Sequence, residues 1–411
     1  MTVRSAQAPT RARRRLAALT TAVLLSAAAL AGCSAKQDDP VAKASDRGGS
    51  ATPPAKTVSA VRLSTNLPKS KHPVSVDTLL HVTASKGTLQ HVSFHAGKSR
   101  VPGSLSGNGR SWTAGDRLEP AKTYQVSAVA VDADGLKKKL ERTFRTVPLT
   151  LDQQTYPSIA PVQGETVGVG MPIIVHFDVP VTDRASIERH LSVQTKPVQQ
   201  GTWHWISDNE VHWRPKTYWK RGTDVTVHAD VNGVAAGNGI FGQMNRSASF
   251  HIGNAVIMKI NLADHEMRVF DNGKLLRTIP VTGGAAGFTT RSGIKVIIEK
   301  FRVKRMNSAT VGIGPNDPNY YNIPDVEFAQ RVTYSGEFLH AAPWSVGDQG
   351  SANVSHGCVG MSTANAAWLY GLTHRGDVVD VSGTSRPMEP DNGYGDWNVP
   401  WKTYKAGSAL H

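Results

Sequence analysis

Two short segments near the C-terminus contain the residue types that thiol chemistry requires. Cys358 ends the tetrapeptide Ser355-His-Gly-Cys, and His340 lies 18 residues upstream in a segment that reads as the end of a strand. A cysteine nucleophile needs a base that makes the thiolate and backbone N–H groups that hold an oxyanion. His340 is a candidate base, and Gly357 lets the backbone approach a substrate closely. These residues predict an enzyme that uses a cysteine nucleophile.

A metal site is the competing interpretation of the same residues. His340, His356 and Cys358 supply three clustered ligands, and no acidic fourth ligand is evident nearby. We therefore expect neither a metal nor another cofactor.

The other cysteine, Cys33, belongs to the N-terminal segment. Five arginines precede an apolar run over residues 16–32, which is typical of a secretory signal. The run ends in Leu30-Ala-Gly-Cys33, which resembles the bacterial lipobox; a plain cleaved signal is the alternative. Acyl chains on Cys33 would anchor the protein to the extracellular face of the cytoplasmic membrane. Cys358 would then stay unpaired outside the cell, as a free reactive thiol.

The net charge fits an extracellular basic protein. The formal charge is +14, and without the five arginines of residues 1–32 it is about +9. Basic folded surfaces attract polyanions. At this location we expect anionic lipids and wall polymers rather than nucleic acid, although ordinary solubility charge explains the excess equally well.

The distribution of residue types along the chain predicts a mainly β protein with several domains. Residues 1–33 are the lipoprotein signal and lipobox, and the small polar residues 34–57 are typical of a flexible tether. Short alternating runs broken by Gly, Asp, Asn and Pro predict two tandem immunoglobulin-like β-sandwiches, at 58–148 and 149–253. The echo of 119–124 in 214–218 supports this internal repeat.

From residue 254 the pattern changes to a β-rich domain that extends to 382, followed by an aromatic extension over 383–411. Asn272-Gly273 predicts a hairpin turn between two strands. Residues 362–370 predict the one principal helix, with Ser362 as its N-cap, and 377–381 predict a closing strand. The aromatic extension either folds back on a neighbouring domain or binds glycan. His204 and His212 are expected on an exposed strand face.

The segment from Tyr334 to Trp344, together with Ser355-His-Gly-Cys358, resembles the L,D-transpeptidase (YkuD-type) catalytic domain. With the lipobox and the tandem immunoglobulin-like domains, the whole chain resembles the actinobacterial lipoprotein members of that family. The resemblance implies a monomer that acts on peptidoglycan stem peptides. Cys358 would attack the third residue of a donor tetrapeptide and release D-alanine. The amine of a neighbouring stem would then take the acyl group, giving a 3→3 cross-link. Carbapenems acylate the same cysteine in this family.

The resemblance also implies roles for the remaining residues. His340 would be oriented by the main-chain carbonyl of Ala341, and His356 would fix its loop or, as the alternative, transfer protons. The N–H groups of Gly357 and Cys358 would form the oxyanion hole. Residues 306–321 would form a lid over the donor groove. Substrate contacts would come from Tyr321 (with Tyr320 as a rival), Ser335, Gly336, Trp344, Ser355 and Gly360; core packing is the alternative for Trp344.

One position departs from the family pattern. Relatives usually have asparagine two residues after the cysteine, whereas this chain has Gly360. The missing amide removes a contact and could change the rate or substrate preference. Two other functions use the same features: an L,D-carboxypeptidase, with water as the acceptor, and a non-catalytic wall-binding lipoprotein.

Overall fold

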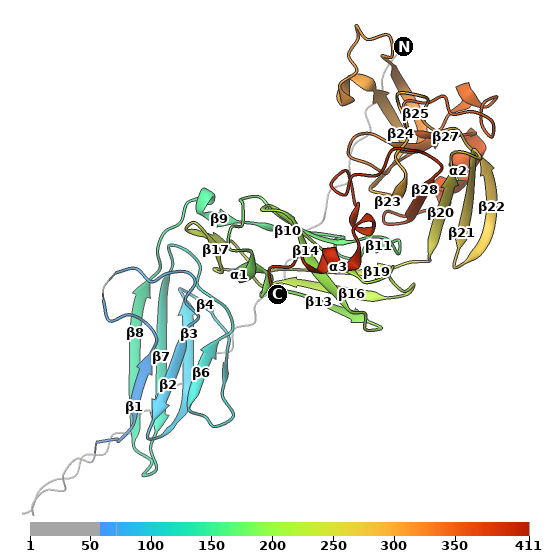
Figure 1. Ribbon diagram of the computed structural model, residues 1–411. Helices are drawn as coiled ribbons and strands as arrows, with labels where there is room; N and C mark the ends of the chain where they lie inside the picture. The colour runs from blue at the N-terminus through green and yellow to red at the C-terminus, as the bar shows by residue number, and fades with distance from the viewer. Residues whose placement is uncertain (1–57, 71, 411) are drawn as a thin grey trace, which may run out of the picture. The chain divides into compact units, whose positions relative to one another are not determined.

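The computed structural model describes residues 58–70 and 72–410 (Figure 1). The predicted signal, the lipobox at Cys33 and the tether therefore lie outside the described residues. Within the described ranges, no helix has the length and apolar character needed to cross a membrane.

The first domain consists of two four-stranded sheets that face each other across a shared apolar core. Alternating residues of β7 (Thr123–Val131) are buried, as expected for a strand with one face on a core. Phe94 stacks on Tyr124 with ring centroids 5.2 Å apart, and no disulfide is needed to join the sheets. One sheet has the order β1 (Arg62–Thr65), β2 (His81–Ser85), β6 (Ser111–Ala114), β5 (Gly103–Leu105), and the other β4 (Ser99–Arg100), β3 (Thr88–Ala96), β7, β8 (Lys137–Arg145).

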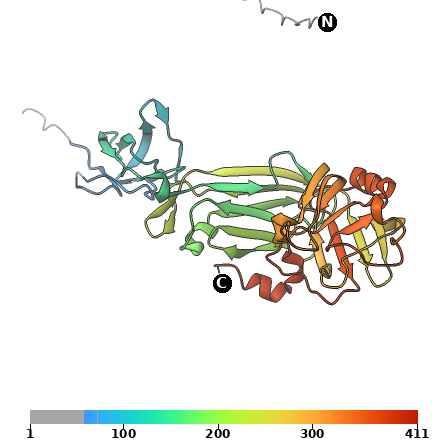
Figure 2. The same ribbon diagram turned by 90° about the horizontal axis from the view of Figure 1, so that it is seen from above.

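The second domain repeats this arrangement with two further four-stranded sheets (Figure 2). Trp213 and Trp219 stack in its core with centroids 5.2 Å apart. The orders are β10 (Pro157–Ala160), β12 (Ile173–Phe177), β15 (Glu210–Pro215), β14 (Gly201–Ser207), and β11 (Thr166–Val167), β19 (Arg246–Ile252), β16 (Asp224–Ala229), β13 (Leu191–Lys196). Smaller elements are η1 (Leu151–Gln153), α1 (Arg184–Glu188) and a sheet of β17 (Ala235–Gly237), β18 (Ile240–Gly242) and β9 (Gln154–Thr155).

The third domain has a five-stranded sheet and a four-stranded sheet. The five-stranded order is β22 (Lys274–Pro280), β21 (Glu266–Asp271), β20 (Val256–Asn261), β28 (Val378–Ser382), β23 (Gly293–Val296). The four-stranded order is β24 (Glu299–Asn307), β25 (Asn322–Arg331), β26 (Phe338–Ala341), β27 (Val359–Met361). The 3-10 helices η2 (Ser308–Val311) and η3 (Pro343–Ser345) lie in its loops, and α2 (Thr363–Leu372) follows β27. Met258, Leu339 and Leu369 belong to one core that joins both sheets to α2.

Local signals in this domain produce the predicted elements. Asn272 and Gly273 both have positive φ, so the Asn-Gly turn of the β21–β22 hairpin is confirmed. The Ser362 side chain accepts a hydrogen bond from Asn365 N–H, so its predicted role as the N-cap of α2 is also confirmed. The closing strand is β28.

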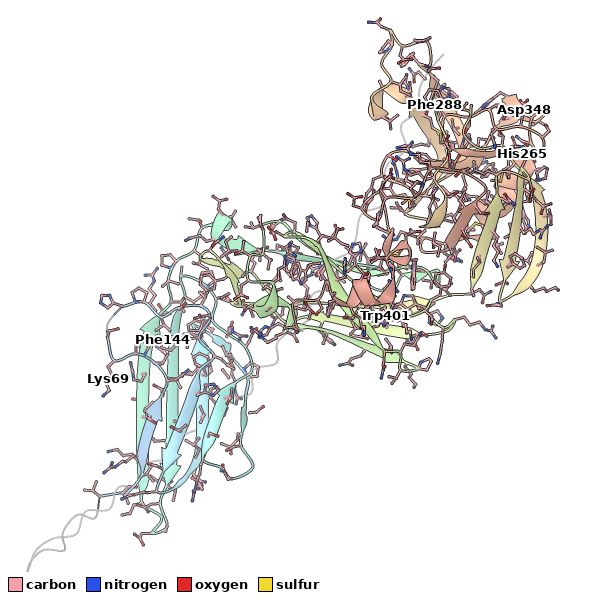
Figure 3. The ribbon with its side chains drawn as sticks, in the orientation of Figure 1. Lys69, Phe144, His265, Phe288, Asp348 and Trp401 are labelled. Atoms are coloured by element: carbon pink, nitrogen blue, oxygen red, sulfur yellow. The ribbon has the colours of Figure 1, made fainter. Side chains whose placement is uncertain are left out.

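The C-terminal extension folds back on the second domain, which was the predicted alternative to glycan binding. It contains η4 (Asp396–Asn398) and α3 (Trp401–Lys405), where Figure 3 labels Trp401. The guanidinium of Arg214 lies 4.6 Å from the ring centroid of Trp397 and 4.1 Å from that of Tyr404.

The expected exposure of His212 is wrong. This histidine is buried, and its Nδ1 lies 3.0 Å from Asp396 Oδ1 while Nε2 lies 2.9 Å from Glu210 Oε1. The extension covers the strand face that would otherwise expose the ring. His204 is half-buried, and its Nδ1 donates to the main-chain oxygen of Tyr404.

Candidate active site

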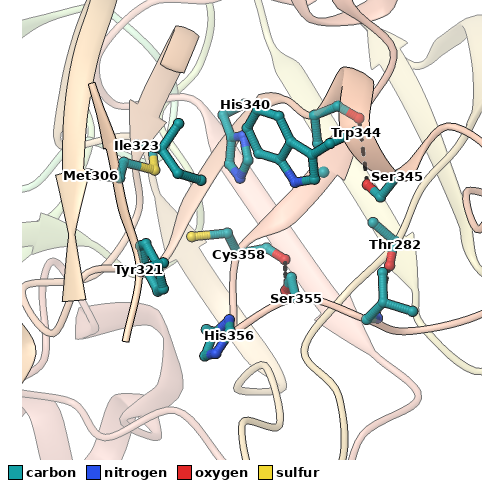
Figure 4. A pocket seen from close by; sticks show the side chains of 13 residues that line it. Thr282, Met306, Tyr321, Ile323, His340, Trp344, Ser345, Ser355, His356 and Cys358 are labelled. Carbon is teal, nitrogen blue, oxygen red and sulfur yellow. Dashed lines mark hydrogen bonds between the residues drawn. The ribbon is translucent and has the colours of Figure 1, made fainter. Parts of the chain in front are cut away.

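The parallel pairing of β26 with β27 positions the two principal candidates. Leu339 is paired with Val359, and His340 is paired with Gly360. Cys358 therefore precedes its strand at the level of Phe338. Since side chains alternate along strands, His340 and Cys358 lie on the same face of neighbouring strands. Both line one cavity of about 270 Å³ (Figure 4).

The Cys358 thiol is buried and makes its hydrogen bond to a main-chain oxygen. Sγ donates to Gly336 O at 3.6 Å. Burial raises the pKa of Cys358 to about 12, although the backbone of Phe338 favours the thiolate. Cys358 is therefore a neutral thiol near neutral pH, and a base would have to remove its proton to make the thiolate.

His340 is fixed in the tautomer that a base requires. The ring is buried, and its Nδ1 lies 2.7 Å from Ala341 O. A carbonyl can only accept, so Nδ1 carries the proton and Nε2 keeps a free lone pair. Burial lowers the pKa of His340, which keeps the imidazole neutral. The ring of Trp344 stacks on it with centroids 5.8 Å apart, and Trp344 is 56% exposed, so plain core packing does not describe this residue.

The turn before Cys358 is held by Ser355. Its hydroxyl donates to Cys358 O at 2.6 Å and accepts from Gly357 N–H at 3.1 Å. Gly357 has φ of +119°, a conformation that strongly favours glycine. Its N–H, a predicted oxyanion donor, is thus already engaged by Ser355 in this structure.

His356 is exposed and lies between two aromatic rings. Its ring centroid is 4.5 Å from that of Phe288 and 4.9 Å from that of Tyr321. These contacts favour a role in fixing the loop over one in proton transfer.

The cavity is bounded on one side by Met306 and Tyr321, which border the predicted lid over 306–321. Figure 4 shows Met306 and Tyr321 on the opposite side of Cys358 from Trp344. Ser308 joins the two ends of this loop: its hydroxyl donates to Ile313 O and accepts from Tyr321 N–H. Burial raises the pKa of Tyr321 to about 12, so its hydroxyl is a neutral hydrogen-bond donor.

Ser335 and Gly336 line a second hollow of about 200 Å³, which shares Tyr321 and His356 with the first. Asn392 of the C-terminal extension bonds Ser335 twice, through the Ser335 N–H at 2.8 Å and the Ser335 hydroxyl at 2.9 Å. Ser335 remains exposed despite these bonds.

Gly360 lines the main cavity, and an added side chain would fill part of it. A Cβ atom there would lie 2.9 Å from Ala342 Cβ and 3.1 Å from Thr282 Cγ2. The Gly360 backbone also exchanges two hydrogen bonds with Thr282. The absence of a side chain therefore widens the cavity beside Cys358.

Two family models and several known proteins match this chain. The model of the L,D-transpeptidase catalytic domain matches residues 255–381, and that of a bacterial Ig domain matches residues 71–235. The chain is 38% identical to L,D-transpeptidase 2 of Mycobacterium tuberculosis over 82% of both chains, and 34% identical to L,D-transpeptidase 5 of the same species over 80% of this chain and 73% of the relative.

The chain belongs to the L,D-transpeptidase family. Among solved structures, it resembles that of the L,D-transpeptidase LdtMt1 in complex with imipenem, with 37% identity, a TM-score of 0.48, and coverage of 55% of this chain and 97% of that chain. The identity to the curated relatives and the family models confirm the predicted resemblance, and the strands of the three domains confirm the predicted mainly β fold class.

Sequence reasoning missed several residues of this L,D-transpeptidase site. Thr282, Ala342 and Ser345 line the cavity, yet their residue types carry no chemical signal. Behind Cys358 lie Lys295 and Glu337, both buried. Over residues 58–70 and 72–410, no group of three or more His, Cys, Asp or Glu side chains is placed to hold a metal ion.

Proposed function

We propose that this member of the family forms 3→3 cross-links between peptidoglycan stem peptides through a Cys358 acyl-enzyme. The observation that carries the proposal is that His340 and Cys358 share one cavity, and that His340 Nδ1–H donates a hydrogen bond to Ala341 O. This arrangement leaves Nε2 as an acceptor beside a thiol that cannot ionise readily by itself.

In the first half-reaction, His340 Nε2 takes the thiol proton while Sγ attacks the carbonyl carbon of the third residue of the donor tetrapeptide. The bond to the terminal D-alanine then breaks, and the imidazolium returns the proton to the leaving amine. The products are a thioester on Cys358 and free D-alanine. The thiol first turns from Gly336 O toward the imidazole, which a rotation about Cα–Cβ allows.

In the second half-reaction, the side-chain amine of the third residue on another stem attacks the thioester carbonyl. Its proton passes to the thiolate through His340, and the 3→3 amide forms as the thiol is restored. The N–H of Cys358 and, once released from Ser355, the N–H of Gly357 support the oxyanion in both steps. Tyr321 and Trp344 border the cavity where the donor stem would bind.

Incubation of the full chain with a disaccharide-tetrapeptide, followed by mass spectrometry, tests this function. A dimer that has lost one D-alanine supports transpeptidation. Free tripeptide without dimer would indicate the carboxypeptidase instead. Neither product, with Cys358→Ala indistinguishable from the wild type, would leave only a wall-binding lipoprotein.

The proposal extends to location and inhibition. Leu30-Ala-Gly-Cys33 supports lipidation of Cys33 and attachment of a monomer to the outer face of the cytoplasmic membrane. Metabolic labelling with a fatty acid should mark the wild type and not Cys33→Ala. The strained lactam carbonyl of a carbapenem can acylate Cys358 with opening of the ring, so that no fragment leaves. We therefore expect a stable adduct.

A further inference from the structure

A buried lysine lies behind the nucleophile. Lys295, on β23, is 1% exposed, and its Nζ donates to Glu337 Oε2. Removing a charge from water is costly unless a partner of opposite charge compensates. Burial lowers the pKa of Lys295, while the Glu337 carboxylate opposes that shift. The two side chains therefore form a specific buried ion pair, unlike the solvated charges on the protein surface.

Glu337 is the centre of a larger network. Its Oε1 accepts from both the main-chain N–H and Nη1 of Arg291, each at 3.0 Å. Arg291 Nε also donates to Glu389, so two cations and two carboxylates balance one another. The main-chain N–H of Glu337 donates to Thr333 Oγ1 at 2.8 Å. Every polar group of Glu337 is thus constrained.

This network lies directly against the segment that holds the thiol. Glu337 is flanked by Gly336, whose carbonyl accepts from Cys358 Sγ, and by Phe338, whose backbone favours the thiolate. A Cβ atom built on Gly357 would lie 3.7 Å from Glu337 Cγ, so the side chain also packs against the nucleophile turn. A shift of Glu337 would displace both the Gly336–Phe338 segment and the turn at Gly357, which surround the thiol.

We propose that Lys295 and Glu337 are positioning residues for Cys358: their ion pair fixes the Gly336–Phe338 segment and the turn at Gly357, and so sets the geometry in which the thiol is acylated. The inference rests on the proposed nucleophilic role of Cys358. Neither side chain lines the cavity of Cys358, although Glu337 lines the second hollow beside it. Both act through the backbone and through their charges.

The two charges act on the thiol in opposite directions, which gives a specific test. Glu337 raises the pKa of Cys358, whereas Lys295 and Arg331 lower it, all three acting beneath the larger effect of burial. The other titratable side chains around the thiol are His340, His356 and Tyr321, which line the same cavity. They are unchanged in the variants below.

The experiment measures alkylation of Cys358 by iodoacetamide in the full chain from about pH 6 to about pH 10, followed at the Cys358 peptide by mass spectrometry. Lys295→Met should slow alkylation at a given pH by about threefold or more, and Glu337→Gln should speed it by a similar factor. Each variant's melting temperature is recorded alongside. A shift of both folded variants in one direction, through loss of the shared ion pair, would also support a positioning role. Profiles of both folded variants that match the wild type would overturn the proposal.

Glu165→Gln is the matched structural control. Glu165 forms a partly buried ion pair with Arg375 and does not line the cavity of Cys358. It should lower the melting temperature and leave the alkylation profile unchanged. A changed profile in this control would assign the effects to general destabilisation and overturn the proposal.

A double variant, Lys295→Met with Glu337→Met, keeps the proposal testable should a single variant fail to fold. Replacing a buried ion pair by apolar residues of similar volume is often tolerated. The double variant should fold, yet acylate from the tetrapeptide about tenfold or more slowly in kcat with little change in KM. A wild-type kcat would overturn the inference. Alkylation of Cys358 needs no substrate. If the wild-type enzyme makes no cross-linked product, that result refutes the proposed function, and the alkylation profiles still test this inference.

Discussion

His340 lies opposite Gly360 in the parallel pairing of β26 and β27, with Cys358 two residues before Gly360 on the same strand face. His340, the proposed base, thus faces a position without a side chain, and the space beside it belongs to the cavity. This relationship makes Gly360 a determinant of room around the reacting atoms.

Gly360→Ala should therefore destabilise the protein and slow acylation. The added methyl would lie 2.9 Å from Ala342 Cβ, and overpacking of this kind costs about 1–3 kcal/mol. Thermal unfolding and the rate of carbapenem acylation measure the two effects. Gly347→Ala is the control, because its Cβ would meet no atom within 4 Å. Equal behaviour of the two variants would show that Gly360 has no special role.

The resting thiol should show the pH dependence of an unassisted, buried cysteine. Because the pKa of Cys358 is raised to about 12, its thiolate fraction should grow about tenfold per pH unit through the neutral range. His340→Ala should change this alkylation profile little, since the thiol bonds Gly336 O rather than the imidazole. The same variant should lower acylation by the tetrapeptide by about 10²–10⁴-fold. If the alkylation rate of the wild type stops rising with pH near neutrality, Cys358 and His340 are not both neutral at rest, which contradicts the prediction.

The C-terminal extension should make stability depend on pH through His212. Burial opposes the charge of His212, but Asp396 and Glu210 outweigh it and raise the pKa to about 9. A raised folded pKa contributes stability that is complete below the unfolded value of about 6.5 and is lost as the pH rises through about 9. The free energy of unfolding should fall over this window by a few kcal/mol.

His212→Gln should remove most of that dependence, as urea unfolding at several pH values would show. His251→Gln is the matched control, since His251 pairs with Asp224 on the surface. If both variants keep the wild-type slope between about pH 6.5 and about pH 9, another group is responsible.

Local signals in the sequence predict much of this protein. The Asn272-Gly273 turn and the Ser362 cap act over a few residues, so the hairpin and α2 follow directly from residue type. The tetrapeptide ending in Cys358 likewise predicts a cysteine nucleophile, because its residue types are those that thiol chemistry requires.

Contacts between segments that are far apart in the sequence could not be predicted from it. His212 bonds Asp396, 184 residues away, so an alternating strand pattern could not reveal that its outer face is covered. Lys295 and Glu337 are 42 residues apart, and a lysine in a short strand is ordinarily read as solvent-facing. Only the packing of the sheets brings these charges together beneath the nucleophile.

The most direct test of the central claim is the intact mass of the full chain during turnover of a tetrapeptide donor whose third-residue side-chain amine is blocked, so that no acceptor is present. The account predicts a covalent adduct equal to the donor minus D-alanine, located on the Cys358 peptide and absent in Cys358→Ala. An adduct on another residue, or release of D-alanine by Cys358→Ala at the wild-type rate, would contradict it.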